Sequence, residues 1–379
     1  MNNHEFWDGN IPWLSAKDLK TFYLSDSIKK VSPAGVTNGT RMVDAGTVLI
    51  LIRGMTLHKD VPVGVATCPV TFNQDLKALE PLDGIDGGFV AAYLTRSKLR
   101  LMQFVSHSGH GTGRLPSDIL ASFPIPAPPL DEQRRIVAVL STWDRGIGEA
   151  ERLLVLKEQR KRALMQQLLT GKRRFPEFKG RWRKFSMSDL FEPVYRTATG
   201  AVEAVLSISS KKGFERQEKK YSKVIAGKNL ENYVILQRGE FAYNKGNSKT
   251  YPQGCIFRLD DYAEAAVPNV YFNFRIKDLS QTDSDFFRSY FEAGLLNMGL
   301  RGLINTGIRN NGLLNIYEPD FYALTVKCPD VTEQRRIAAV LNTCDDELRH
   351  LRAQVAVLKQ QKKGLMQKLL TGQVRVPTR

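Results

Sequence analysis

The stretch 106–114, Ser-His-Ser-Gly-His-Gly-Thr-Gly-Arg, holds the densest group of side chains that could do chemistry. Its glycines could let backbone amides approach a phosphate, but the stretch runs into Leu115-Pro116 and not into the helix start that supplies such amides. His107 and His110 could bind a metal ion, but no clear third ligand accompanies them, and we predict no metal site. A loop that contacts DNA fits better than either, because Arg114 can donate two hydrogen bonds to guanine, and an ordinary surface loop is the equal alternative.

A second stretch, 302–312, holds the equivalent place later in the chain. It offers Arg309, Asn310 and Asn311, and asparagine suits adenine as arginine suits guanine. We therefore predict base contacts from both stretches, one in each half of the chain.

The sequence contains no recognisable catalytic motif. An adenine methyltransferase commonly clamps the flipped base with Asn or Asp followed by Pro-Pro-Tyr or Pro-Pro-Phe, and neither occurs. There is no Walker lysine loop to cradle phosphates. Glu218-Lys-Lys220 has the glutamate-to-lysine spacing of a nuclease, but no convincing aspartate stands upstream to complete a Mg²⁺ site. We expect a binding protein without catalytic residues.

The chain carries 55 Lys and Arg against 39 Asp and Glu, a net charge of +16. A field of that size attracts a polyanion, so nucleic acid is the leading partner class, although a basic chain can also be merely soluble. Most basic side chains at a DNA surface contact phosphate, and few reach bases. The candidates in the first half are Lys17, Arg41, Arg53, His58 and Lys59. Those in the second half are Lys211, Lys212, Arg216, Lys219, Lys220, Lys245, Asn247 and Lys249.

Three features bear on where the protein works. The longest apolar run, 48–52, is far short of the roughly 20 residues that a membrane helix needs. The start, 1–10, is polar and acidic, without the basic flank and apolar stretch of a signal peptide, so we expect a cytoplasmic protein. Neither a zinc site nor a disulfide framework is suggested by the widely spaced cysteines, which we expect to be reduced and buried: Cys68, Cys255, Cys328 and Cys344.

The sequence contains a long internal repeat. Glu132-Gln-Arg-Arg-Ile136 returns as Glu333-Gln-Arg-Arg-Ile337, and Leu168-Leu-Thr-Gly171 returns as Leu369-Leu-Thr-Gly372, both at an offset of 201. With no gap, 19 of the 40 positions in 132–171 are identical to their partners, which excludes chance. Each half is therefore a variable globular part followed by a constant helical part.

Upstream of this repeat the halves match more loosely, in the same order. Asp86-Gly-Gly-Phe89 resembles Asp283-Ser-Asp-Phe286, and Gly46 before Val-Leu-Ile resembles Gly239 before Glu-Phe-Ala-Tyr. Gly239 stands 68 positions after the first helix-ending glycine, so 67 residues lie between them, whereas 45 residues precede Gly46. The first half is therefore expected to lack about 22 residues that correspond to 182–191 and the residues after them, which puts the completeness of its globular part in doubt.

The constant part has the pattern of a long helix. Asp131 and Thr332 are plausible N-caps, and Gly171 and Gly372 are suitable stops. Apolar residues recur at spacings of three and four over about five heptads, with lysines interrupting the stripe. The stripe of the first copy is Ile136, Leu140, Trp143, Ile147, Leu154, Leu164 and Leu168. That of the second is Ile337, Leu341, Leu348, Leu351, Val355, Leu358, Leu365 and Leu369.

A helix of about 40 residues spans roughly 60 Å, so it must pack along a partner. Each helix could pack on its own globular domain, but two matching stripes in one chain favour an antiparallel pair. We predict an α+β fold with a pseudo-twofold internal repeat, in which an antiparallel coiled coil separates two globular domains. The domains are 1–129 and 173–331, and the helices are 130–172 and 332–379. The stretch 172–184, with seven basic residues, is either a phosphate track or a solvated connector.

A variable domain, then Pro-Pro-Leu-Asp-Glu-Gln-Arg-Arg-Ile at 128–136, then a helix ending in Leu-Met-Gln-Gln-Leu-Leu-Thr-Gly at 164–171, all present twice, closely resembles the specificity subunits of Type I restriction-modification systems. The resemblance covers nearly the whole chain, and the duplicated Glu-Gln-Arg-Arg-Ile and Leu-Leu-Thr-Gly signatures are specific to that family. The stretch 6–19 also looks like the strand and loop that open many first target-recognition domains.

The resemblance implies that each globular domain is a target-recognition domain for one half of a split, asymmetric DNA sequence, and that the helices act as a ruler and dock partner subunits. The implied partners are double-stranded DNA, two modification (methyltransferase) subunits and restriction subunits. No cofactor is expected on this chain, because S-adenosylmethionine, Mg²⁺ and ATP belong to those subunits. Two alternatives are a DNA-recognition fragment of a self-contained restriction-methylation enzyme and a coiled-coil adaptor without DNA affinity.

Overall fold

The computed structural model describes residues 3–107, 111–197, 202–209, 213–220, 232–246, 250–304 and 314–377, with backbone alone at 107, 219 and 220. The chain forms two compact units. Unit 1 comprises Met1–Arg152 with Ala353–Arg379, and unit 2 comprises Leu153–Arg352. Each of two long helices therefore contributes one half to each unit.

Unit 1 is built on a four-stranded sheet of order β2-β7-β5-β9. The central strand β5 (Val48–Leu51) is buried at every residue, as expected for an uninterrupted apolar run. It pairs antiparallel with β7 (Val63–Ala66) and β9 (Leu76–Leu79), and β2 (Tyr23–Leu24) adds to β7 in parallel. The helix α2 (Gly87–Arg96) packs on β5 and β7 through its buried aromatic and alanine side chains.

The described residues of unit 1 form two further sheets and five short helices. One sheet has the order β3 (Lys29–Val31), β1 (Trp7–Leu14), β8 (Val70–Phe72), β4 (Arg41–Val43). The other has the order β10 (Ser106–His107), β11 (Gly113–Arg114), β6 (Arg53–Gly54). The short helices are η1 (His4–Phe6), α1 (Pro33–Gly39), η2 (Met55–His58), α3 (Lys98–Met102) and α4 (Ser117–Ala121).

Unit 2 is built on a sheet of order β13 (Phe191–Pro193), β20 (Phe272–Ile276), β17 (Phe241–Asn244), β18 (Cys255–Arg258). Its core is aromatic: the rings of Phe241 and Phe274 stack at 5.4 Å, and Phe191 meets both edge-on. Three two-stranded sheets are β12 (Arg183–Ser186) with β21 (Thr325–Cys328), β14 (Leu206–Ser209) with β15 (Gly213–Arg216), and β16 (Tyr233–Gln237) with β19 (Glu264–Pro268). The short helices are α6 (Met187–Leu190), α7 (Gln217–Lys220), α8 (Ser284–Glu292), α9 (Asn297–Leu303) and α10 (Glu318–Ala323).

The two units repeat one plan. In each, a glycine with positive φ turns the chain into the central strand: Gly46 at 91° before β5 and Gly239 at 88° before β17. In each, an aspartate caps the helix that follows the sheet. Asp86 and Asp283 accept a hydrogen bond from the backbone N–H three residues on, at 2.9 and 2.8 Å. The mixed helix and strand composition and the internal repeat predicted from the sequence are confirmed.

One part of unit 2 has no counterpart in the described residues of unit 1. The strands β12 and β13, with α6 between them, pair with β21 and β20 respectively. In the described part of unit 1, β9 pairs only with β5, and 124–127, which corresponds to β21, forms no strand. The stretch 183–193 is therefore the one that the comparison of the two halves leaves unmatched.

The constant parts are two long helices, α5 (Leu130–Leu168) and α11 (Val331–Leu370). Both are followed by a glycine with positive φ, Gly171 at 70° and Gly372 at 71°, as a helix stop requires.

The N-caps assigned from the sequence are wrong. Asp131 lies inside the first turn of α5, because the helix begins at Leu130 and the carbonyl of Pro129 already accepts from the N–H groups of Glu132 and Gln133, at 2.9 and 3.1 Å. Thr332 likewise lies inside α11. The cap of α11 is Asp330, whose carboxylate accepts hydrogen bonds from the N–H groups of Thr332 and Glu333, each at 3.1 Å. These bonds hold the pKa of Asp330 below its ordinary value.

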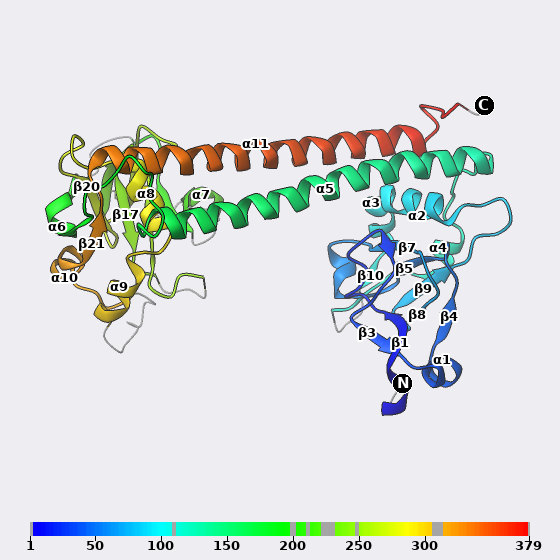
Figure 1. The fold of residues 1–379 in the computed structure, drawn as a ribbon. Helices are drawn as coiled ribbons and strands as arrows, with labels where there is room; N and C mark the ends of the chain where they lie inside the picture. The colour runs from blue at the N-terminus through cyan, green and yellow to red at the C-terminus, as the bar shows by residue number, and fades with distance from the viewer. Residues whose placement is uncertain are drawn as a thin grey trace. The chain divides into compact units, whose positions relative to one another are not determined.

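The helices α5 and α11 pair antiparallel within each unit (Figure 1). In unit 1, Asp144 and Glu151 of α5 pair with Lys362 and Lys359 of α11. In unit 2, the ion pairs are Lys157 with Glu347 and Glu158 with Arg352. Residue numbers thus rise along one helix as they fall along the other.

The helix ends also pack on globular domains, so both interpretations of the apolar stripe hold. Ile136 and Leu140 join Leu369 in the core of unit 1, whereas Leu168 joins Ile337 and Leu341 in the core of unit 2. Of the predicted stripe, the buried members are Ile136, Leu140, Ile147, Leu168, Ile337, Leu341, Leu348, Val355 and Leu369. The half-buried members are Trp143, Leu154, Leu164, Leu351, Leu358 and Leu365.

Two lysines that interrupt the stripe form equivalent ion pairs. Lys161 is only 8% exposed, and its Nζ lies 2.6 Å from Asp345 on α11 and 2.6 Å from Glu292 on α8. Lys362, 201 residues later, pairs with Asp144, which is 201 residues before Asp345. The interruptions are therefore part of the repeat.

We expect Asp345→Ala to destabilise unit 2 more than Lys161→Met. The first leaves a buried ammonium with one exposed carboxylate partner, at a cost of about 1–3 kcal/mol, whereas the second replaces the cation with an apolar chain of similar length and costs under about 1 kcal/mol. Urea unfolding followed by far-ultraviolet circular dichroism measures both free energies. Equal losses, or a larger loss for Lys161→Met, would show that the ion pair itself holds the helices.

The state of the cysteines and the apolar character of the helices can be compared with the expectations from the sequence. All four cysteines are free. Cys255 and Cys328 are buried, and burial raises their pKa values to about 11 and about 12, so they are unreactive thiols at neutral pH. Cys68 and Cys344 are half-buried, which corrects the expectation that all are buried. No helix within the described ranges is both long and apolar enough to cross a membrane.

Candidate nucleic-acid interface

The three-stranded sheet of unit 1 brings two of the predicted DNA contacts together. Arg53 on β6 lies directly opposite Arg114 on β11, so the two side chains leave the sheet on the same face. Both are exposed, and neither has an acidic partner among the residues that the structure describes. Like charges directly opposite each other destabilise a sheet. A pair kept there is suited to a polyanion that neutralises both.

The segment after Arg53 adds polar groups to the same place. The helix η2 packs against β11, and His58 at its end contacts the carbonyl oxygen of Gly111 through Nε2 at 2.6 Å. Lys59 follows and is exposed. The glycines here have a packing role as well, because a Cβ at Gly113 would lie 2.8 Å from Leu57 Cβ.

Two other candidates of the first domain lie elsewhere. Arg41 begins β4, in a different sheet, and its guanidinium is paired with Glu80. Lys17 is exposed on the turn after β1. The structure therefore groups Arg53, Arg114 and the η2 segment, and leaves Arg41 and Lys17 outside that group.

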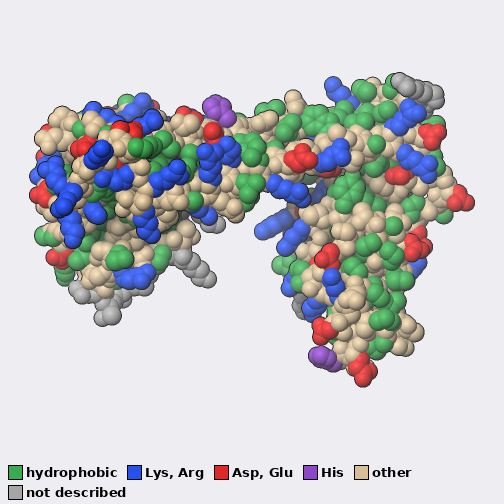
Figure 2. All heavy atoms as spheres, in the orientation of Figure 1, with side chains coloured by type: hydrophobic (Ala, Val, Ile, Leu, Met, Phe, Trp, Pro, Cys, Tyr) green, Lys and Arg blue, Asp and Glu red, His purple; other side chains and the backbone are tan. Residues whose placement is uncertain are grey.

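In the second domain the two candidates with described side chains are both engaged. Arg216 on β15 donates from Nε to the hydroxyl of Tyr262 at 3.1 Å and pairs with Glu218 at 3.2 Å. The Nζ of Lys245 stands 4.1 Å from the ring centroid of Phe272. Figure 2 shows Lys and Arg side chains spread over the visible face of unit 2, with Asp and Glu among them.

Most of the remaining predicted base and phosphate contacts lie outside the described residues. This holds for His110, Lys211, Lys212, Asn247, Lys249, Arg309, Asn310 and Asn311, and for the side chains of His107, Lys219 and Lys220. Within the described ranges no group of three or more His, Cys, Asp or Glu side chains could hold a metal ion.

The repeated motif Glu-Gln-Arg-Arg-Ile acts in a way that the sequence reasoning missed. Glu132, buried at the start of α5, accepts two hydrogen bonds from Arg375, just beyond the end of α11, both at 2.6 Å. Glu333 accepts two from Arg174, just beyond the end of α5, at 2.9 and 2.6 Å. Each ion pair ties the start of one long helix to the end of the other. The signal was present in the sequence, since Arg174 and Arg375 are also 201 apart.

The glutamine of the motif joins the long helix to the globular part of the same half. The Gln133 side chain accepts a hydrogen bond from the N–H of Asp86 at 2.9 Å and donates to the carbonyl of Pro128 at 2.7 Å. Gln334 repeats this with the N–H of Asp283 at 2.8 Å and the carbonyl of Pro329 at 2.9 Å. Asp86 and Asp283 are the caps of α2 and α8, so the domain helix is held directly on the long helix.

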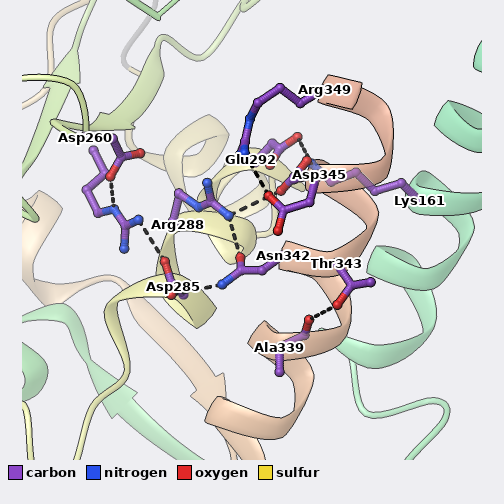
Figure 3. A network of polar contacts seen from close by, with 12 residues as sticks. Lys161, Asp260, Asp285, Arg288, Glu292, Ala339, Asn342, Thr343, Asp345 and Arg349 are labelled. Atoms are coloured by element: carbon purple, nitrogen blue, oxygen red, sulfur yellow. Dashed lines mark hydrogen bonds and ion pairs between the residues drawn. The ribbon is translucent and has the colours of Figure 1, made fainter. Parts of the chain in front are cut away.

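A polar network adds a second attachment in unit 2 (Figure 3). Asp285 on α8 pairs with Arg258 on β18 at 2.8 Å and accepts from Asn342 on α11 at 3.0 Å. Arg288 on α8 bridges Asn342 and Asp345, at 2.6 and 3.2 Å. Burial opposes ionisation of Asp285, but the hydrogen bonds and positive charges around it outweigh that effect and hold its pKa below the ordinary value.

The exposed arginine pair of unit 1 stands on a globular plan that unit 2 repeats. Residues 2–157 match the model of the Type I restriction modification DNA specificity domain. Over these residues the chain is similar to the DNA specificity domains of Type I restriction-modification systems.

Two Type I restriction enzyme specificity subunits resemble this chain over different lengths. The Type I restriction enzyme EcoR124I/EcoR124II specificity subunit of Escherichia coli is 30% identical over 145 residues, which are 38% of this chain and 36% of that protein. This match therefore spans about a third of the relative's length. The MjaVIII specificity subunit of Methanocaldococcus jannaschii is 24% identical over 97% of this chain and 87% of that protein.

The fold is also that of a solved structure. The crystal structure of a Type I restriction-modification system S subunit from M. genitalium superimposes with a TM-score of 0.56 at 13% identity. The superposition covers 96% of this chain and 93% of that one.

Proposed function

We propose that this chain selects the DNA sequence on which a Type I restriction-modification complex acts, as its non-catalytic subunit. The observation that supports this proposal most directly is the exposed pair of Arg53 and Arg114. The two arginines lie on neighbouring strands of a domain that matches the DNA specificity family. Two guanidinium groups held side by side repel each other, and a phosphate or the acceptor edge of guanine offsets that repulsion.

The internal repeat supports a target in two parts. Each unit carries one recognition domain on the same plan, so each would read one half-site. The half-sites would differ because the domains differ in their loops and in their basic residues. The long helices, which contribute to both units, would set the distance between the half-sites.

The repeat also suits the proposed partners. Two copies of the helical motif present two equivalent surfaces, which fits two modification subunits, with restriction subunits joining that complex. S-adenosylmethionine, Mg²⁺ and ATP would bind to those subunits and not to this chain. A complex that acts on cellular DNA would work in the cytoplasm.

The double variant Arg53→Ala with Arg114→Ala should weaken binding to random-sequence DNA on the order of tenfold. It should also reduce the steepness of the slope of log K against log salt concentration by about two. Its melting temperature should stay level or rise, because the repulsion between the two guanidinium groups is gone. Fluorescence anisotropy with labelled duplex at several salt concentrations measures the first two effects.

A matched control removes the same amount of positive charge from a different surface of the protein. Arg145→Ala with Arg152→Ala removes two exposed arginines from α5, neither of which has an ion-pair partner within the described ranges. If both double variants lose the same affinity, net charge alone explains binding, and the Arg53 and Arg114 pair is no interface.

The second recognition domain is tested through Arg309. We expect Arg309→Ala to weaken or relax recognition of one half-site by roughly 1–3 kcal/mol and to leave the other unchanged, as the loss of one base contact would. Competition binding with single-base variants of each half-site measures this. A loss spread equally over both halves would contradict the assignment of this arginine to one half-site.

A further inference from the structure

Four charged residues beside the seam between α5 and α11 depart from the internal repeat. Glu158 pairs with Arg352 in unit 2, and Glu151 pairs with Lys359 in unit 1, each at 2.6 Å. The offset of 201 relates Glu158 to Lys359 and Glu151 to Arg352. At these two equivalent positions α5 is therefore acidic both times, and α11 is basic both times.

Lys157 with Glu347 also departs from the repeat, because the equivalent positions are Leu358 and Gly146, whereas the remaining charge pairs follow it. Asp144 and Lys161 of α5 have their equivalents in Asp345 and Lys362 of α11, so each helix carries one acid and one base. The junction pairs behave in the same way, because each half of the chain supplies one glutamate and one arginine. These pairs cannot tell α5 from α11.

This difference matters because the helices have the same length and stripe. An α5 helix from a second copy of the chain could lie in the place of α11 with its apolar residues in register. Asp144 and Lys161 would then find each other across the two copies. Glu151 would instead face Glu158, and in a pair of α11 helices Arg352 would face Lys359.

We infer that these four charges select the pairing of α5 with α11 and exclude pairs of like helices from two copies of the chain. All four side chains are between 32% and 57% exposed, so each ion pair adds little stability. Selection depends on the difference in free energy between the α5–α11 pair and a pair of like helices. At each of these four residues the first pairing brings attraction and the second brings repulsion. Pairs of like helices would bring two identical recognition domains together. The four charges would therefore favour the pairing that keeps two different domains in one assembly.

The test exchanges charge without changing the net charge. In Glu158→Arg with Lys359→Glu, the pair of α5 and α11 meets two repulsions, whereas like helices meet attraction. At about 20 mM salt, where screening is weak, the full chain should melt about 2–6 °C lower than wild type and form more dimer at micromolar concentration. At about 1 M salt both differences should vanish. Sedimentation equilibrium measures the mass, and differential scanning calorimetry the melting.

The control variant is Glu158→Arg with Arg352→Glu. It restores attraction between α5 and α11, so its melting temperature should equal that of wild type. If the first variant keeps the wild-type mass at every concentration, the inference is overturned even when its melting temperature falls, because the charges would then stabilise the pair without selecting it.

The control also carries the test if the first variant does not fold. It permits both kinds of pairing, since like helices would now meet attraction too. Refolded from denaturant at high protein concentration, it should give a larger dimer fraction than wild type at low salt. An equal dimer fraction contradicts the inference.

Discussion

Adding one heptad to each long helix, after Leu154 and after Val355, should lengthen the preferred spacer between the two DNA half-sites by about three base pairs. The two positions are equivalent in the repeat and lie in paired parts of the antiparallel helices, so the apolar stripe stays in register. Seven residues add about 10 Å at 1.5 Å per residue, and a base pair rises about 3.4 Å.

The spacer is measured by selecting bound DNA from a library in which the half-site separation varies. Overall affinity should fall as well, since three base pairs turn the duplex by over a quarter of its roughly ten-base-pair repeat. A control variant replaces seven residues at each position with the same inserted sequence and keeps the length. An unchanged preferred spacer in the folded insertion variant would mean that these helices do not set the distance.

Removing Arg174 should destabilise the protein more than removing Arg375, although both make the same contact. Arg174→Ala leaves Glu333, whose side chain is fully buried, without its charge partner. We expect the melting temperature to fall on the order of 10 °C, because an uncompensated buried charge is costly. Arg375 is 67% exposed, so water replaces it more readily, and Arg375→Ala should lower the melting temperature by only about 2–4 °C.

Lowering the pH should weaken the ion pair of Glu132 and Arg375 at the junction in unit 1. The hydrogen bonds and charge of Arg375 hold the pKa of Glu132 below its ordinary value of 4.5. A depressed folded pKa stabilises the fold above the unfolded value and loses that effect as pH falls through the folded pKa. The difference in melting temperature between wild type and Arg375→Ala should therefore shrink below about pH 4.5. Equal destabilisation by the two arginine variants at every pH would contradict this account of the junctions.

The repeat made the plan of the fold predictable. The offset of 201, read from identical residues, indicated two equivalent halves and two long helices, and the caps Asp86 and Asp283 explain why the looser matches upstream keep their order. The helix starts were misplaced because Asp131 and Thr332 are residue types that favour N-cap positions, although both lie inside the first turn. The residue that caps each helix depends on the path of the preceding chain.

The residue types of the candidate site were predictable from the sequence, but which of those residues lie together was not. Arg53 and Arg114 were both selected as basic residues, but they meet only because β6 and β11 pair, and strands of two residues show no periodicity. Lys161 and Lys362 looked like breaks in an apolar stripe, since their partners lie on the other helix. Such contacts between distant parts of the chain depend on tertiary packing, which a single sequence does not display.

The most direct test of the central claim is to select DNA from a fully random duplex library with this chain bound to modification subunits, and to sequence what is retained. The account predicts two different short half-sites separated by a spacer of fixed length and free sequence. Arg53→Ala with Arg114→Ala should blur only one half-site. Enrichment of one continuous or palindromic motif, or of no motif at all, would contradict the proposal that this chain reads a split, asymmetric target.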